Sequence, residues 1–69
     1  MSISRLIRKA LIDEHMTQNE LASLLGKDPQ QVRNTLYRDS FNSSTAEAWF
    51  EALGYEIVIR NKKTGKIID

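Results

Sequence analysis

The sequence contains no cysteine and a single histidine, so two common ways of stabilising a small chain are closed to it. Without cysteine there is no disulfide and no thiolate ligand for a metal, and His15 alone cannot form a zinc cluster. A chain of 69 residues buries only about 60% of the surface that it exposes when unfolded. Small folds often rely on a staple or a partner, which leaves an oligomer as the candidate here.

Long apolar runs are also missing. No run approaches the roughly 20 residues needed to cross a bilayer, and arginine and lysine interrupt the N-terminal segment where a signal peptide would need an apolar core. We therefore expect a cytoplasmic protein. The formal net charge is only +1, so the local distribution of charge must decide whether the chain binds nucleic acid.

Catalytic patterns are absent as well. The sequence has no nucleophile–base pair, no glycine-rich phosphate loop and no metal-ligand spacing, so we expect neither an enzyme nor a cofactor. Glu20 and Glu47 each stand three residues after a threonine or serine, which is the position of a helix cap and not of a catalytic acid.

Four helices are predicted, and the first lies within SISRLIRKALIDEH. Ser2 or Ser4 can cap it, and Arg5, Arg8 and Lys9 form a solvated face that can also approach a DNA backbone. Its apolar residues follow the spacing of one helical face: Ile3, Leu6, Ile7, Ala10 and Leu11.

The second and third helices follow each other closely. Thr17 and Glu20 form a capping box at the start of the second, and Gly26 occupies the left-handed position that ends it. Asp28 then caps the third helix and Pro29 fits its first turn. Gln31 is the expected capping-box partner of Asp28. The residues expected to face inward are Val32 and Leu36, with Thr35 as a further candidate.

The fourth helix follows the polar segment DSFNSS, in which Phe41 is expected to anchor the loop. Ser44 and Glu47 predict a third capping box, and Gly54 ends the helix. The period then changes, because YEIVIR alternates as a half-buried strand does, with Tyr55, Ile57 and Ile59 on one face. NKKTG has turn chemistry, and residues 66–68 form a possible return strand.

The segment TQNELASLLG, followed by a capped helix, resembles the helix-turn-helix motif of the lambda-repressor-like (Xre/Cro-type) family, and supplies the first helix of that motif. Such a motif needs a small residue in its first helix, glycine in the turn and an apolar residue on the second helix, here Ala22, Gly26 and Val32. The resemblance extends over residues 5–54 and includes STAEAWFEALG as the closing helix. It implies a DNA-binding domain, which the predicted helices place over residues 1–54 as a mainly α, four-helix unit. Members of this family commonly have five helices, whereas here the alternating tail predicts a C-terminal strand or hairpin over 55–69.

The resemblance also implies which residues contact DNA. In this family the second helix of the motif enters the major groove and reads bases with its N-terminal part, which carries over to Gln30, Gln31, Arg33 and Asn34. Amides suit adenine and guanidinium suits guanine, and Pro29, where many relatives have a polar reader, shifts the expected readout toward Gln30 and Arg33. The implied phosphate contacts are Thr17, Gln18, Lys27, Tyr37, Arg38, Asn42 and Ser43, and Gln18 is also expected to support a side chain of the recognition helix.

Several of these residues have plain structural alternatives. The glutamines suit any solvated helix surface, and Gln31 can be occupied at the cap. Tyr37 can pack its ring on the core and keep its hydroxyl in water. Trp49 and Phe50 suit a core or a dimer contact better than a stacking platform.

The tail raises the question of a partner, because Ile57, Val58 and Ile59 are apolar on both faces of the predicted strand and a lone edge of this kind is unfavourable. The strand can pair within the chain, or two chains can pair across a two-fold axis. We expect a homodimer, and its interface residues are Trp49, Phe50, Tyr55, Ile57, Val58 and Ile59. The basic residues Arg60, Lys62, Lys63 and Lys66 either touch flanking phosphates or keep the edge soluble.

Taken together, these patterns predict a dimeric, sequence-specific transcriptional regulator, a repressor that reads a palindromic operator with residues 29–38. Two alternatives remain open at this point. One is a module of the same fold that binds a protein, such as an antitoxin or an anti-repressor target. The other is a non-specific architectural DNA binder.

Overall fold

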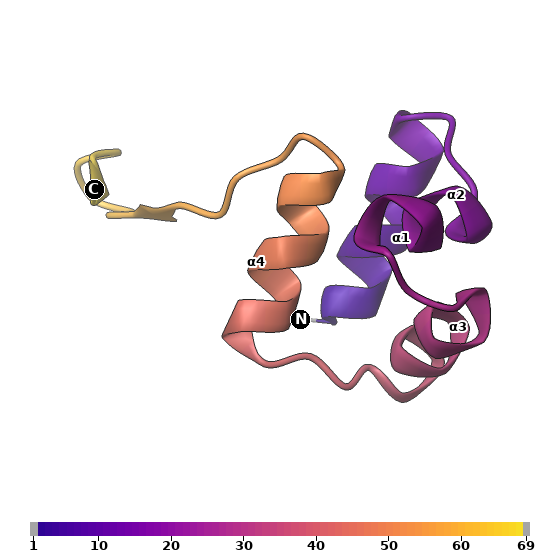
Figure 1. Ribbon diagram of the computed structural model, residues 1–69. Helices are drawn as coiled ribbons and strands as arrows, with labels where there is room; N and C mark the ends of the chain where they lie inside the picture. Colours follow the sequence, from indigo (N-terminus) through magenta and orange to yellow (C-terminus); the bar gives the residue numbers. More distant parts are fainter. Residues whose placement is uncertain (1, 69) are drawn as a thin grey trace.

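A computed structural model describes residues 2–68 and contains four helices followed by a two-stranded hairpin (Figure 1). The predicted mainly α fold with a C-terminal hairpin is confirmed. Met1 and Asp69, the outer ends of the two expected segments, lie outside the described residues. Within residues 2–68, no helix is both long and apolar enough to span a bilayer. The elements are α1 (Ile3–Asp13), α2 (Gln18–Leu25), α3 (Pro29–Arg38), α4 (Ser43–Ala52), β1 (Ile59–Arg60) and β2 (Ile67–Ile68).

The helix ends largely follow their capping residues. Ser2, one of the two candidates, caps α1 through a bond from the Arg5 N–H. Thr17 and Glu20 form the predicted reciprocal capping box of α2. Gly26 then ends that helix with φ of 65°, a left-handed conformation that glycine adopts without steric cost. These local signals set the spacing of the first three helices.

Asp28 caps α3 as predicted, but the capping boxes predicted for α3 and α4 are both wrong. The Asp28 carboxylate accepts the N–H of Gln30 at 2.7 Å, and Gln31 is not its reciprocal partner, because the pair of bonds of a capping box is absent from this described helix start. In α4 the cap is Asn42, whose Oδ1 accepts the Thr45 N–H at 2.8 Å. The helix therefore starts at Ser43, and Ser44 lies inside its first turn.

The core lies where all four helices meet. Ile7, Leu21, Val32, Leu36 and Trp49 are each at most 2% exposed. Phe41 anchors the loop before α4 as predicted, because its ring meets that of Trp49 edge to face with centroids 4.8 Å apart. At about 25 cal/mol per Å² of buried apolar area, side chains of this size supply most of the stability of such a domain.

A polar contact joins the first turn of α1 to the end of α3. Asp39 has a left-handed backbone (φ 52°) just past α3, and its Oδ1 accepts the Ser4 N–H at 2.9 Å. The buried Ser4 hydroxyl donates to the carbonyl of Leu36 at 2.6 Å. These two bonds hold the end of α3 against α1. The hydrogen bond from the Ser4 backbone N–H is the largest cause that holds the pKa of Asp39 below its ordinary value of 3.8.

Asp39→Asn should therefore lower stability at neutral pH and weaken the loss of stability in acid. A carboxyl with a lowered pKa in the folded state stabilises that state above its unfolded pKa, and this contribution disappears as the pH falls through the folded pKa. Asparagine tolerates the left-handed backbone, so the change isolates the charge. Urea midpoints at neutral pH and below pH 3.8 measure the effect. Glu47→Gln is the charge control, because Glu47 is an exposed residue of α4. An acid dependence equal to that of the wild type would contradict this role.

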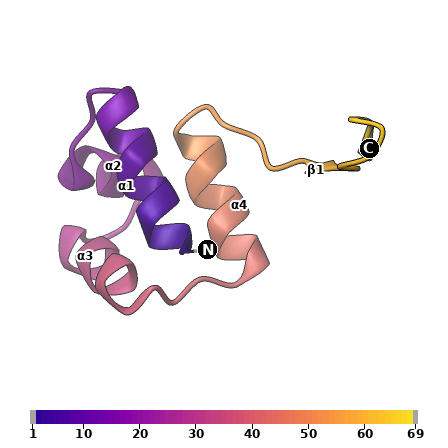
Figure 2. The ribbon, with the colours of Figure 1, turned by 180° about the vertical axis from the view of Figure 1, so that it is seen from behind.

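The C-terminal arm, residues 55–68, leaves the helices and ends in the hairpin (Figures 1 and 2). The strands pair within the chain, antiparallel, with Ile59 opposite Ile68 and Arg60 opposite Ile67. The turn is the predicted one, since the Gly65 N–H bonds to the Asn61 carbonyl at 2.8 Å. The predicted half-buried strand over 55–60 is wrong in extent, because only Ile59–Arg60 is strand and residues 55–60 are exposed.

Candidate nucleic-acid interface

The pair α2–α3 has the packing that the motif requires. Ala22 on α2 and Val32 on α3 are both completely buried, and α2 packs more extensively against α3 than against any other described element. The rest of α3 is exposed except Leu36 and the half-buried Pro29 and Thr35. The loop that follows it and the start of α4 lie on the same side of the molecule as α3 (Figures 1 and 2).

Three of the four predicted base readers form one hydrogen-bonded row on the surface of α3. Gln30 Nε2 donates to Asn34 Oδ1 at 3.0 Å, and Arg33 Nη2 donates to Gln30 Oε1 at 2.9 Å. All three side chains are exposed, so the bonds orient them without burying them. The amide nitrogen of Asn34 takes no part in this row, and Arg33 retains further N–H donors. The row therefore presents oriented donors to solvent.

A residue of α2 that sequence reasoning missed holds this row in place. Asn19 Oδ1 accepts from Arg33 Nη1 at 3.3 Å. The supporting role expected of Gln18 falls to Asn19 instead, and Gln18 is half-buried at the start of α2. The sequence shows only that Asn19 is a polar residue next to Gln18. The packing of α2 against α3 is needed to show that Asn19 faces Arg33.

The remaining predicted contacts surround α3. Gln31 is exposed, as are Lys27 and Arg38. Tyr37 is 87% exposed, so its ring does not pack on the core, which was one of its two interpretations. Thr17 and Asn42 are exposed but use side-chain oxygens as helix caps, and Ser43 is exposed at the start of α4. The start of a helix favours anions, because its first N–H groups lack partners within the helix.

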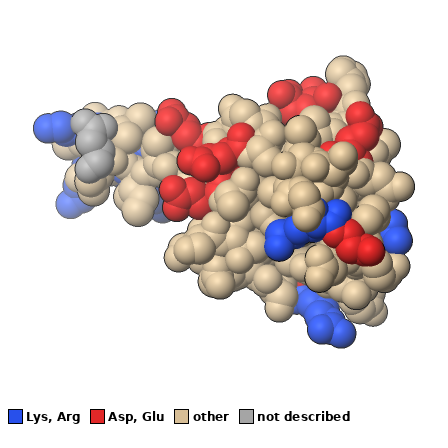
Figure 3. All heavy atoms as spheres, viewed as in Figure 1, with Lys and Arg blue, Asp and Glu red and all other residues tan. Residues whose placement is uncertain are grey.

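Charge is divided unevenly along the chain. Residues 1–58 carry six Lys or Arg and eight Asp or Glu, whereas residues 59–69 carry four Lys or Arg and one Asp. On the face in Figure 3, cations lie around α3, with an acid beside them, and at the far end of the arm, and other acids gather along the upper edge and beside the root of the arm. The helical body therefore offers phosphate only a few cations, close to α3.

The residues expected at a dimer interface fall into two groups. Trp49 and Phe50 belong to the core of the single chain, at 2% and 9% exposure, so Trp49 has almost no surface left for a partner. Tyr55, Ile57, Val58 and Ile59 lie on the arm and are 37–68% exposed. Only this second group is available to another molecule.

Groups of acidic or histidine side chains that would hold a metal are absent from residues 2–68. The structure brings together Asn19, Gln30, Arg33 and Asn34 as one exposed polar surface, with Lys27, Gln31, Tyr37 and Arg38 around it. Comparison of the chain with protein-family models, with curated proteins and with solved structures finds no match.

Proposed function

We propose that this protein is a sequence-specific DNA-binding regulator that inserts α3 into the major groove. The observation that carries the proposal is the exposed row Gln30–Arg33–Asn34, oriented by Asn19. These groups contribute nothing to the core, yet they are ordered relative to one another. Amide and guanidinium groups in fixed positions are what base edges in the major groove require.

The surrounding groups suit the DNA backbone. Lys27 and Arg38 are exposed near the two ends of α3, and Tyr37 presents its hydroxyl to solvent. Phosphate contacts fix the position of a protein on the duplex, and base contacts give it specificity. The helical body has few cations and more acids than bases. This favours a protein that depends on base contacts over one that binds DNA of any sequence through phosphates alone.

The working form in this proposal is a cytoplasmic homodimer that represses by occupying a palindromic operator. Two copies of α3 about 34 Å apart would meet successive major grooves on one face of the duplex. The exposed apolar residues of the arm supply the surface for the second copy.

Selection of binding sites from random duplex DNA at two salt concentrations tests the function directly. A palindromic motif with half-sites about one helical turn apart is the expected result. Salt-sensitive binding without a motif would indicate an architectural protein, since phosphate contacts alone lower log affinity by about 0.9 per phosphate per unit of log salt. No binding at either concentration would overturn the proposal and direct the search to a protein partner.

Arg33→Ala should weaken binding to the selected site by about 1–3 kcal/mol and relax base preference at one position of each half-site. This corresponds to roughly 5- to 150-fold in affinity. The reason is that Arg33 is the only cation in the row that Gln30 and Asn34 complete. Fluorescence anisotropy with the selected site and single-base variants measures both effects.

Lys27→Ala is the matched control, because Lys27 is an exposed cation outside the row. It should weaken binding to all sequences alike and reduce the salt slope by about 1 per copy. If Arg33→Ala behaved in the same way, Arg33 would be a phosphate contact and not a reader.

A further inference from the structure

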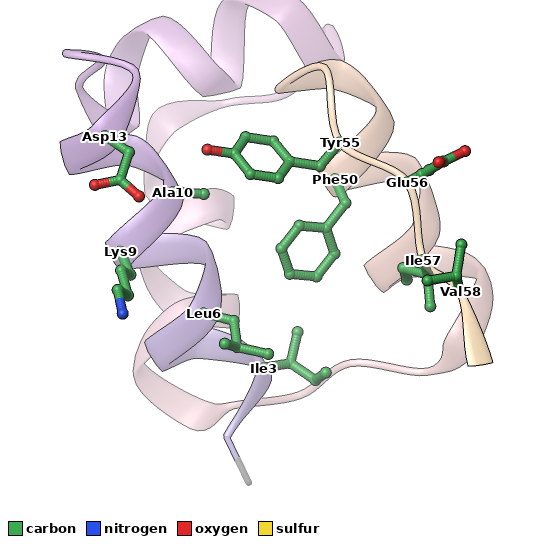
Figure 4. A pocket seen from close by; sticks show the side chains of 10 residues that line it. All are labelled: Ile3, Leu6, Lys9, Ala10, Asp13, Phe50, Tyr55, Glu56, Ile57 and Val58. Atoms are coloured by element: carbon green, nitrogen blue, oxygen red, sulfur yellow. The ribbon is translucent and has the colours of Figure 1, made fainter. Parts of the chain in front are cut away.

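An apolar groove lies between α1 and the root of the arm (Figure 4). Leu6 and Ala10 form its α1 side, and Phe50, Tyr55 and Ile57 lie opposite. The ring centroids of Phe50 and Tyr55 are 6.5 Å apart. Its volume of about 450 Å³ is in the range of clefts that enclose ligands. Leu6 belongs to the apolar stripe of α1 but is 37% exposed, so the helices leave this part of the stripe uncovered.

The hairpin carries apolar side chains that have no core of their own. Ile59, Ile67 and Ile68 are 68%, 46% and 68% exposed. A two-stranded hairpin alone is marginally stable at best in water. In both views of the ribbon the hairpin lies apart from the four helices (Figures 1 and 2). Its isoleucines therefore have no partner among the helices of their own chain.

The single chain is also less compact than its mass predicts. Its accessible surface is 5526 Å², whereas a folded chain of 7.9 kDa should expose about 4,400 Å². Its radius of gyration is 13.0 Å, against about 11 Å for a compact domain of this length. The excess surface is about 1,100 Å², and a stable interface buries roughly 800 Å² on each partner. One copy thus has enough spare surface for a dimer.

Charges on the groove and on the hairpin are opposite. Asp13 and Glu56 line the groove, together with one cation, Lys9. Partial desolvation, followed by repulsion from Glu14 and Asp13, raises the pKa of Tyr55, and Asp13 lines the same groove as Tyr55. Residues 59–69 carry four cations and one acid, and Figure 3 shows acids beside the root of the arm and cations at its far end.

We propose that the hairpin of a second copy lies in this groove, and that the two copies exchange hairpins reciprocally about a two-fold axis. The inference rests on the proposed homodimer and names its contact. Ile67 and its neighbours would cover Leu6 and Ile57, and the lysines would face Asp13 and Glu56. A two-fold exchange uses the same two surfaces on both copies, so neither an apolar groove nor an apolar hairpin stays exposed in the dimer.

The placement of the hairpin separates this contact from DNA binding. The hairpin lies on the side of the molecule opposite α3 (Figures 1 and 2), so its cations do not extend the α3 surface of their own copy. The same chain cannot fill its own groove with its hairpin, because residues 55–58 already form one wall and β1 follows directly.

Sedimentation of two variants and one control tests the contact. Leu6→Asp in the groove and Ile67→Asp in the hairpin should each reduce the measured mass from twice 7.9 kDa to 7.9 kDa. Ile12→Asp should remain dimeric, because Ile12 is a 73% exposed residue of α1 that does not line the groove. Circular dichroism checks that all three variants keep their helices. A monomeric wild type, or a dimeric Leu6→Asp variant, would overturn the proposal.

Disulfide cross-linking identifies which surfaces meet. The chain has no cysteine of its own, so only the introduced cysteines can react. Chains with Leu6→Cys and chains with Ile67→Cys are mixed and oxidised, and the expected product is the mixed disulfide. Ile12→Cys replaces Leu6→Cys in the control and should give little of it. If Ile67→Cys chains linked mainly to one another, the hairpins would pair edge to edge and the groove would be unused.

The two proposals fail separately in these experiments. Leu6 and Ile67 lie outside the α3 surface, so a monomeric variant should still bind a single half-site, although more weakly than the dimer binds a full site. A dimer that ignores DNA would overturn the proposed function and leave the exchange intact. A monomeric wild type that binds a half-site would overturn the exchange and the proposed homodimer, and would leave α3 as the helix that reads DNA.

Discussion

A Trp49→Ala variant should lose about 3–5 kcal/mol of its free energy of unfolding. Trp49 is 2% exposed, meets Phe41 edge to face and belongs to the core that all four helices share. Its Nε1 has no hydrogen-bond partner among the described residues. The loss therefore comes from the cavity and the missing ring contacts, and no hydrogen bond is given up.

The size of the chain makes this change severe. A domain of 69 residues has roughly 3–10 kcal/mol of stability in total, so the variant should be close to its unfolding midpoint in buffer. Urea titration followed by far-ultraviolet circular dichroism measures the shift.

Two further substitutions make the Trp49 experiment interpretable. Trp49→Phe should retain much of the stability, because it keeps a ring at the site and removes an N–H that is buried without a partner. Tyr37→Ala, at 87% exposure, should change stability by less than about 0.5 kcal/mol. Equal losses in the Trp49→Ala and Tyr37→Ala variants would contradict the assigned core.

Ala22→Leu should destabilise the fold by about 1–3 kcal/mol and also abolish selective DNA binding. Ala22 is completely buried on α2, so a larger side chain must displace a packed neighbour. Because α2 packs mainly against α3, the displacement changes the angle and height of α3. Asn19 would then no longer reach Arg33, which it contacts at 3.3 Å.

Ser23→Leu is the matched control, since it adds the same side chain to the exposed side of α2. Urea titration and anisotropy with the selected operator should show loss of stability and selectivity for Ala22→Leu alone. Selective binding by a folded Ala22→Leu variant would show that α3 does not depend on this close approach.

The sequence predicts what depends on neighbouring residues and misses what depends on distant ones. The capping box of Thr17 and Glu20, the turn at Gly26 and the start of α3 at Pro29 are all local, and all are confirmed. The cap of α4 was misplaced because asparagine and serine both cap helices. In the structure Asn42 caps α4, and the residue before it, Phe41, packs its ring against Trp49. The local sequence pattern does not show this contact.

The strand prediction failed for a related reason. Alternation over Tyr55–Arg60 shows which side chains share a face, but a strand also needs a hydrogen-bonding partner of equal length. The turn at 61–65 leaves only β1 and β2 to pair, and residues 55–58 instead border the groove along α1. In the candidate site, the row on α3 follows from helical spacing, whereas the role of Asn19 depends on how α2 approaches α3.

The contact between Ser4 and Asp39 has a consequence for the order in which the chain folds. The two residues are 35 positions apart, so joining them closes a loop at a cost of about 3 kcal/mol of chain entropy. The contacts of α2 with α3 span far fewer residues and form at a lower entropic cost. The α2–α3 pair can therefore assemble first, and α1 can dock afterwards, when the Ser4 hydroxyl bonds to the Leu36 carbonyl of an already formed α3.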